Sequence, residues 1–206
     1  MKKFETCAVI EATIQNTLNA VPDVEKESRW EGRTVAVTQF KECIHDQGLV
    51  IQGERCAWCT LFIGERGRRT AHRDHIAPKS RYPQWTFTPE NLVLACEYCN
   101  GFAVKSDLDT VADVGPTYDS STFFLVHPYI DEPHDHIEFA LTPENHGVVI
   151  RAKNGSTKGV WTIENLKLDS PGLTQERAKD ALIEEDRAVL PDYYRSLFDQ
   201  ATDIGN

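Results

Sequence analysis

Four cysteines in two Cys-x-x-Cys pairs are the residues of this chain whose type and spacing most directly suggest chemistry. Cys56 and Cys59 form the first pair, and Cys96 and Cys99 form the second. One Cys-x-x-Cys turn can present two thiolates to one metal, so two turns supply the four ligands of a tetrahedral zinc. Because a site with four thiolates has no open position, we expect a structural zinc whose binding stabilises the fold.

The segment between the two pairs holds groups suited to hydrolysis. Asp74 and His75 are neighbours, and on an extended strand their side chains would point to opposite faces. An imidazole with an ordinary pKa near 6.5 is a suitable general base at neutral pH. A hard divalent cation prefers oxygen ligands, which Asp74 and the amide of Asn100 can provide. The sequence therefore predicts a catalytic divalent metal held by few protein ligands.

The order of these residues resembles the HNH endonuclease family, also called the His-Me or ββα-metal finger. The resemblance rests on Asp74-His75-Ile76-x-Pro78-Lys79-Ser80 followed by Asn91-Leu92-Val93-Leu94-x-Cys96-x-x-Cys99-Asn100, and it covers roughly residues 54–105. It implies phosphodiester hydrolysis, with 5′-phosphate and 3′-hydroxyl products.

The resemblance also implies a role for each residue. His75 matches the general base, Asp74 a metal ligand, and Asn91 the asparagine that braces the loop and orients the base. Asn100 occupies a position that is often histidine in the family, which shifts the expected metal toward magnesium or manganese. Three basic residues are placed to hold flanking phosphates: Arg73, Lys79 and Lys105. Arg66, Arg68 and Arg69 would extend that grip from the preceding turn.

The charge of the chain is uneven. The 206 residues carry a formal net charge of −10, which argues against a protein that coats nucleic acid. Residues 53–81, however, hold seven basic and three acidic residues, so the basic segment coincides with the hydrolytic motif. Residues 106–206 hold 8 basic and 19 acidic residues and form a candidate docking surface for a protein partner. The absence of a long apolar run and of a secretory signal predicts a cytoplasmic protein without membrane contact.

We expect an α+β fold in three parts. Residues 1–53 form a helical segment, with helices over 5–21 and 33–47 that end near Pro22 and Gly48. Residues 54–108 form the zinc-stabilised HNH core, with strands at 60–63, 70–76 and 91–95 and a short helix from Glu97 to about Lys105. Residues 109–206 form a C-terminal α/β extension, with strands at 121–126, 137–141 and 148–150, and helices at 173–190 and 193–201.

Several other side chains allow two interpretations. The cluster His127, Asp131, His134, Asp135 and His136 could bind a metal, although its two prolines and irregular spacing favour a polar or packed loop. His72 could be an additional ligand, but a non-catalytic role is favoured. Trp58, Tyr82 and Trp85 could stack on bases, although packing around a small zinc fold is favoured.

The longer outline resembles stand-alone HNH proteins of bacterial antiphage defence, such as the Septu nuclease and retron-associated effectors. The residues that carry this resemblance are the His127-Pro128-Tyr129-Ile130-Asp131-Glu132-Pro133 segment and Lys158-Gly159-Val160-Trp161-Thr162-Ile163. It implies an ATPase partner. The leading hypothesis is a DNA endonuclease that acts in such a system. The alternatives are an RNase that cuts tRNA, a subunit active only with its ATPase, and an inactive zinc-stabilised binding module.

Overall fold

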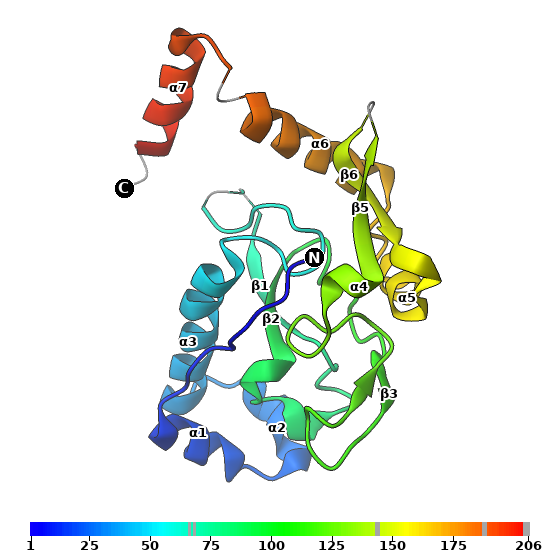
Figure 1. Cartoon of the computed structure of the whole chain (residues 1–206). Helices are drawn as coiled ribbons and strands as arrows, with labels where there is room; N and C mark the ends of the chain where they lie inside the picture. The colour runs from blue at the N-terminus through cyan, green and yellow to red at the C-terminus, as the bar shows by residue number, and fades with distance from the viewer. Residues whose placement is uncertain (66, 68, 143–144, 187–188, 204–206) are drawn as a thin grey trace.

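The structure is a computed structural model that describes residues 1–65, 67, 69–142, 145–186 and 189–203. Helices and short antiparallel strands alternate along the chain, which confirms the expected α+β class (Figure 1). No helix among these residues is long and apolar enough to cross a membrane.

Three helices form the N-terminal part: α1 (Ala12–Asn19), α2 (Asp23–Trp30) and α3 (Val35–Gln52). The helix expected over 5–21 is therefore too long, because residues before 12 run as an extended chain. Val9 in this stretch exchanges two hydrogen bonds of 2.9 Å with the Gln47 side chain, which satisfies its backbone without a helix. The expected stop at Gly48 is also wrong: α3 continues to Gln52, and Gly53 ends it in the left-handed conformation with φ 62°.

The central part is a two-stranded antiparallel sheet, β1 (Ala71–His75) and β2 (Leu92–Cys96), in which Asp74 pairs with Val93 and His75 with Leu92. A loop with two short 3₁₀ turns, η1 (Pro83–Trp85) and η2 (Pro89–Asn91), joins the strands. Residues 97–107 form successive turns, so the helix predicted from Glu97 to about Lys105 is wrong. The strand expected at 60–63 is reduced to an isolated bridge between Arg55 and Phe62.

Within its described ranges, the C-terminal part adds two hairpins and four α-helices. Strands β3 (Val111–Asp113) and β4 (Thr122–Phe123) form one hairpin, and β5 (Ile137–Thr142) and β6 (Asn145–Ala152) form the other. The helices are α4 (Pro133–His136), α5 (Thr157–Asn165), α6 (Pro171–Asp186) and α7 (Asp192–Asp203), with a 3₁₀ turn η3 (Lys153–Gly155) before α5. Helix α6 packs against β6, and α7 lies beyond it at the top of the view (Figure 1).

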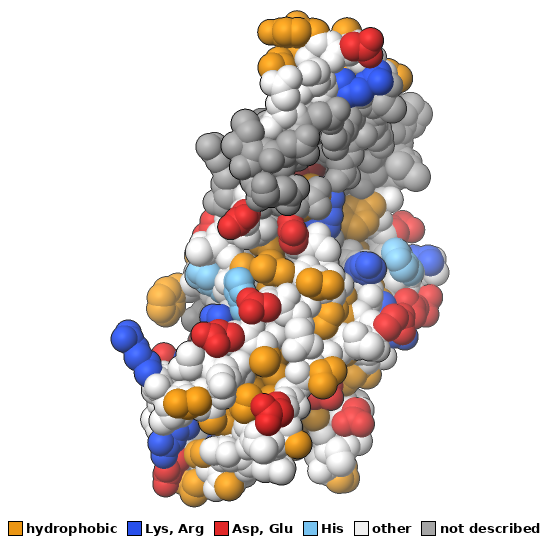
Figure 2. Space-filling view, turned by 90° about the vertical axis from the view of Figure 1, so that its left-hand side faces the viewer, with side chains coloured by type: hydrophobic (Ala, Val, Ile, Leu, Met, Phe, Trp, Pro, Cys, Tyr) orange, Lys and Arg blue, Asp and Glu red, His pale blue; other side chains and the backbone are white. Residues whose placement is uncertain are grey.

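Two groups of buried apolar side chains hold the fold together. The larger includes Phe4, the four paired cysteines, Leu125 and Leu168, so N-terminal, central and C-terminal segments contribute to it. The smaller lies among the N-terminal helices and includes Leu18, Trp30, Phe40 and Leu92. The face that carries the N-terminal helices shows acidic and basic side chains interspersed with apolar ones (Figure 2).

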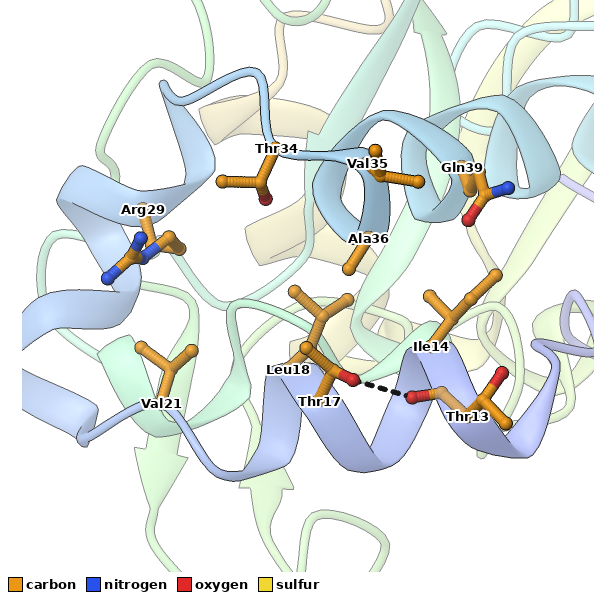
Figure 3. Close-up of a pocket in the computed structure, with 10 residues that line it drawn as sticks. All are labelled: Thr13, Ile14, Thr17, Leu18, Val21, Arg29, Thr34, Val35, Ala36 and Gln39. Carbon is orange, nitrogen blue, oxygen red and sulfur yellow. Dashed lines mark hydrogen bonds between the residues drawn. The ribbon is translucent and has the colours of Figure 1, made fainter.

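An apolar groove of about 580 Å³ runs between α1 and α3. Figure 3 shows Ile14 and Leu18 of α1 pointing toward Val35 and Ala36. Arg29 is the one charged residue that lines it, so the groove offers no acid–base pair and we assign it no chemistry.

Candidate active site

The four paired cysteines meet at one buried point. Their sulfur atoms all lie within 4.8 Å of one another, and each of the four residues is at most 2% exposed. Sγ of Cys59 lies 3.8 Å from Sγ of Cys96. A tetrahedral zinc with Zn–S bonds of about 2.3 Å separates its sulfur ligands by about 3.8 Å, so the cluster has the size of a four-thiolate zinc site. Burial raises the pKa of the Cys56 thiol, so several thiolates can coexist here only with a bound cation.

A cavity of about 570 Å³ lies beside β1 and brings together residues from four segments. It is lined by Glu27 and Trp30 of α2, by residues 72–75 of β1, by Pro78, Lys79 and Ser80 of the following loop, and by Asn100, Gly101, Phe102, Ser106 and Asp107 of the turns after β2. Asp74, His75 and Asn100, which the sequence predicted to work together, therefore share one cavity.

His75 occupies the face of β1 that is turned toward the N-terminal helices. Its Nε2 lies 3.0 Å from the carbonyl oxygen of Thr86, which can only accept, so Nε2 carries the proton and Nδ1 keeps its lone pair. The Trp30 ring packs edge-on against the imidazole, with centroids 4.4 Å apart. His75 is 7% exposed, and this burial lowers its pKa to about 3. The ring is therefore neutral at neutral pH, but in this buried state it is a weaker base than an imidazole with the ordinary pKa near 6.5.

Asp74 occupies the opposite face of β1 and is only 2% exposed. Nζ of Lys105 lies 2.8 Å from Oδ1, and Nε1–H of Trp58 donates to Oδ2 at 2.7 Å. Lys105 also donates to the carbonyl oxygen of His75. Burial raises the pKa of Asp74, while the Lys105 cation opposes that rise.

Lys105 corrects the sequence prediction. It was expected to hold a flanking phosphate, but its side chain is 0% exposed and its ammonium is committed to Asp74. Lys105 lies on the buried side of β1, where its ammonium donates to the Asp74 carboxylate and to the carbonyl oxygen of His75. Trp58 is 0% exposed, which agrees with the packing role favoured for it.

The other two predicted phosphate-binding residues line the cavity. Nε of Arg73 donates to the carbonyl oxygen of Lys41 at 2.6 Å, and the arginine is half-buried. Nζ of Lys79 lies 3.2 Å from Glu31 and 4.0 Å from Glu27 of α2. Arg69 lies elsewhere, with Nη2 2.8 Å from Glu176 of α6. Arg66 and Arg68 fall outside the described residues.

Asn91 is fully buried and ties both ends of the loop between β1 and β2. Its Oδ1 accepts from the Ala77 amide at 2.7 Å, and its Nδ2 donates to the carbonyl oxygens of Ala77 and Trp85, each at 3.1 Å. The loop contains Thr86, whose carbonyl holds His75. This is the position expected of a residue that braces the loop.

The cavity contains donors of the type that a hard divalent cation prefers. Asp74 and Asn100 provide oxygen atoms, and His72 lines the same cavity. A carboxylate has about four lone-pair sites, and the Asp74 carboxylate uses two for Lys105 and Trp58. The donor types therefore suit a divalent cation, but the donors are few and the Asp74 charge is already balanced by Lys105. Such a site should hold its cation weakly until a phosphate contributes further oxygen ligands.

Two features of the site have no local signal in the sequence. Trp30 lies in a highly charged helix without a motif. Tyr118 lies in the part expected to be a C-terminal extension, yet its hydroxyl lies 3.0 Å from Oδ1 of Asn91. Both contacts join segments that are distant in sequence.

The His127–His136 segment is a loop as far as Glu132 and then forms α4 (Pro133–His136); His127 is packed, as favoured, while His134 and Asp135 are exposed. His127 is 0% exposed, and the cysteine cluster is the one metal-ligand group of three or more His, Cys, Asp and Glu found among the described residues.

Comparison with known proteins agrees with this geometry. Residues 56–102 match the family model for HNH endonucleases. Protein ea31 of Escherichia phage lambda is 34% identical over 88 residues, which cover 43% of this chain and 25% of that protein. Septu protein PtuB of Bacillus mycoides (strain KBAB4) is 26% identical over 146 residues, which cover 62% of this chain and 47% of that protein. The matched regions thus span about a quarter and about half of these relatives. Residues 56–102 of this chain, with the cysteine cluster and the cavity beside β1, form an HNH endonuclease domain.

Proposed function

We propose that this protein is a metal-dependent endonuclease that hydrolyses phosphodiester bonds, with DNA favoured over RNA as its substrate. The observation that carries the proposal is the state of His75. Its Nε2–H is held by the Thr86 carbonyl, and its ring lines a cavity shared with Asn100 and Lys79. No hydrogen bond to Nδ1 is present within the described part of the chain, so that lone pair is available to take a proton from water.

The remaining residues of the cavity bind and orient the substrate in this proposal. Arg73 and Lys79 line the cavity and would place a phosphate beside His75. A magnesium or manganese ion held by Asp74 and Asn100 would neutralise charge on the phosphate and on the departing 3′ oxygen. Because Asp74 is paired with Lys105, binding of this ion should depend on the substrate.

The structural zinc belongs to the same proposal. The four-cysteine cluster joins the segment before β1 to the end of β2, and these two strands carry the motif residues. All six cysteines are unpaired in the structure, which favours a reducing compartment such as the cytoplasm.

We further propose that the protein is the nuclease effector of a bacterial antiphage defence system that includes an ATPase. The support is the similarity to Septu protein PtuB over 146 residues, which extends beyond the HNH domain into the C-terminal part. A subunit that is active only with such a partner is the second candidate. The ion pairs of Lys79 favour this second candidate. Its ammonium pairs with Glu31 and lies 4.0 Å from Glu27, so the charge of one of the two proposed phosphate-binding residues of the cavity is neutralised in the isolated chain.

The test is cleavage of plasmid DNA and of total RNA by the purified zinc-loaded protein with magnesium or manganese. The wild type is compared with His75→Ala and with His134→Ala, which removes an exposed histidine outside the cavity. We expect cleavage by the wild type and by His134→Ala, and none by His75→Ala. Equal cleavage by all three proteins would contradict the proposal. A folded wild type that cuts neither polymer would favour the partner-dependent subunit.

A further inference from the structure

His127 has no role in the proposed reaction, yet it is among the most completely buried polar side chains that the structure describes. His127 is 0% exposed and Tyr118 is 7% exposed. Their side chains meet, with the Tyr118 hydroxyl 2.8 Å from Nε2 of His127. Burial of a polar pair costs free energy unless its hydrogen bonds are satisfied. The hydrogen-bond partners of Tyr118 and His127 therefore indicate the role of the pair.

The direction of each hydrogen bond follows from the backbone. Nδ1 of His127 faces the amide N–H groups of Tyr129 and Ile130, at 3.2 and 3.3 Å. An amide N–H can only donate, so Nδ1 accepts and the ring proton is on Nε2. Nε2–H therefore donates to the Tyr118 oxygen, and the Tyr118 hydroxyl is left to donate to Oδ1 of Asn91, 3.0 Å away.

Asn91 is the point at which this chain of hydrogen bonds reaches the nuclease site. Its Oδ1 also accepts from the Ala77 amide, and its Nδ2 donates to Trp85, next to Thr86 in sequence. Thr86 in turn holds Nε2 of His75. The Ala77 N–H and the carbonyl oxygens of Ala77 and Trp85 require this orientation of the Asn91 amide, and the Tyr118 hydroxyl supports it with a further hydrogen bond to Oδ1.

The other end of the chain is anchored in the C-terminal part. The backbone N–H of His127 donates to Oδ2 of Asp131 at 2.8 Å. Both oxygens of Asp131 accept from Lys158 of α5, at 2.7 and 2.8 Å. The Val126 amide donates to the Thr162 hydroxyl of the same helix at 2.8 Å. Helix α5 therefore holds the segment that carries His127.

We propose that Tyr118 and His127 are positioning residues of the nuclease site. They support the orientation of Asn91, and through the loop from residue 76 to residue 91 they stabilise the placement of the His75 ring. The C-terminal part, which lies outside the matched HNH region, thereby contributes to the geometry of the active site. The expected change in kcat rests on the proposed function. The expected change in the hydrogen exchange of the Ala77 amide rests on the hydrogen bonds alone.

The test uses two tyrosines that differ in their partner. Tyr118→Phe removes the donor to Asn91, while Tyr129→Phe removes a hydroxyl that donates to the Leu92 carbonyl at 2.9 Å. Neither variant changes the shape of the side chain, but Tyr118→Phe also removes the acceptor of the His127 Nε2–H and should lose more stability, so kcat is compared under conditions where both variants are folded. We expect Tyr118→Phe to lower kcat by about tenfold to a hundredfold with KM unchanged, as for a small displacement of a reacting group. Tyr129→Phe should retain the wild-type kcat.

The structural readout is hydrogen exchange of the Ala77 amide, measured by NMR on the full zinc-loaded chain. The amide should exchange faster in Tyr118→Phe, and at the wild-type rate in Tyr129→Phe. Equal exchange and equal kcat in the two variants would overturn the inference. If the wild type cleaves nothing, the proposed function fails, and the exchange rates still decide whether Tyr118 positions Asn91.

A second pair of variants keeps the test independent of Tyr118. His127→Gln retains an N–H donor of similar reach, whereas His127→Leu has none. Higher kcat and slower Ala77 exchange in the glutamine variant would support the positioning role. Indistinguishable values for two equally folded variants would contradict it.

Discussion

Removal of the Lys105 ammonium should be among the most destabilising single changes in this protein. In the variant Lys105→Met the apolar stem is conserved, but the Asp74 carboxylate, 2% exposed, loses the cation 2.8 Å from its Oδ1. Breaking a buried ion pair by removing one partner costs about 3–5 kcal/mol, because the remaining charge is left without compensation. For a chain of this size that is equivalent to a fall of about 10 °C in melting temperature.

The assay is urea unfolding of the zinc-loaded protein, with Lys3→Met as the matched control. Lys3 also pairs with a distant carboxylate, Glu132 at 3.2 Å, but the two side chains are 32% and 46% exposed. Exposed pairs contribute about 0–1 kcal/mol, so this control should unfold almost like the wild type.

Two further measurements distinguish the loss of the Lys105–Asp74 ion pair from a loss of packing as the cause of the destabilisation. In the double variant Asp74→Asn/Lys105→Met no charge is buried, so it should be more stable than Lys105→Met alone. In Lys105→Met the pKa of Asp74 should rise further, so the deficit should shrink as the pH falls and the carboxyl takes up a proton. The reasoning is refuted if Lys105→Met lies within about 1 kcal/mol of the wild type, or if the two single changes are additive.

Three other predictions follow from the metal cluster, the buried histidines and one glycine. Removal of zinc by a chelator, or the substitution Cys99→Ser, should unfold the HNH domain, because the free energy of structural zinc binding, about 10 kcal/mol or more, is as large as the whole stability of a domain. Circular dichroism and metal analysis would measure the loss of structure and of zinc. An unchanged melting temperature without metal would contradict the prediction. His75 and His127 both have a pKa of about 3 in the fold and should return to about 6.5 on unfolding, so only the unfolded chain takes up these protons between those values. Stability should therefore fall as the pH is lowered, by about 4 kcal/mol from pH 7 to pH 5 for the two histidines together, and a flat urea midpoint over this range would refute the assignment. Gly159→Ala should cost about 3 kcal/mol, because its Cβ would lie 2.2 Å from the His136 carbonyl oxygen. Gly172→Ala, with nothing within 4 Å, should stabilise α6 slightly, and equal thermal shifts for the two would argue against this difference in packing.

The features that the sequence could predict are those set by short-range geometry. Two Cys-x-x-Cys turns can bind one metal wherever they lie, and their sulfur atoms do meet. Alternation along a strand places Asp74 and His75 on opposite faces, as their contacts with Lys105 and Thr86 show. The α+β class follows in the same way from local patterns of apolar residues.

The features that could not be predicted depend on long-range contacts. Lysine is almost never fully buried, and the partner that allows the burial of Lys105 is 31 residues away. Gly48 looked like a helix stop, but α3 passes through it because Leu94 packs closely there; a Cβ would lie 3.0 Å from the Leu94 side chain. Trp30 and Tyr118 reach the site only through the tertiary fold. No local pattern carries such information.

The four-cysteine cluster also has a consequence for the order of assembly during synthesis. Cys59 and Cys96 are separated by 37 residues, and His75, Asp74 and Asn91 all lie between them. A chain that leaves the ribosome cannot place all four cysteines around one metal until Cys99 has emerged, so the residues of the proposed site remain unassembled during their synthesis. The supply of metal would therefore determine when the proposed site forms, as well as its later stability.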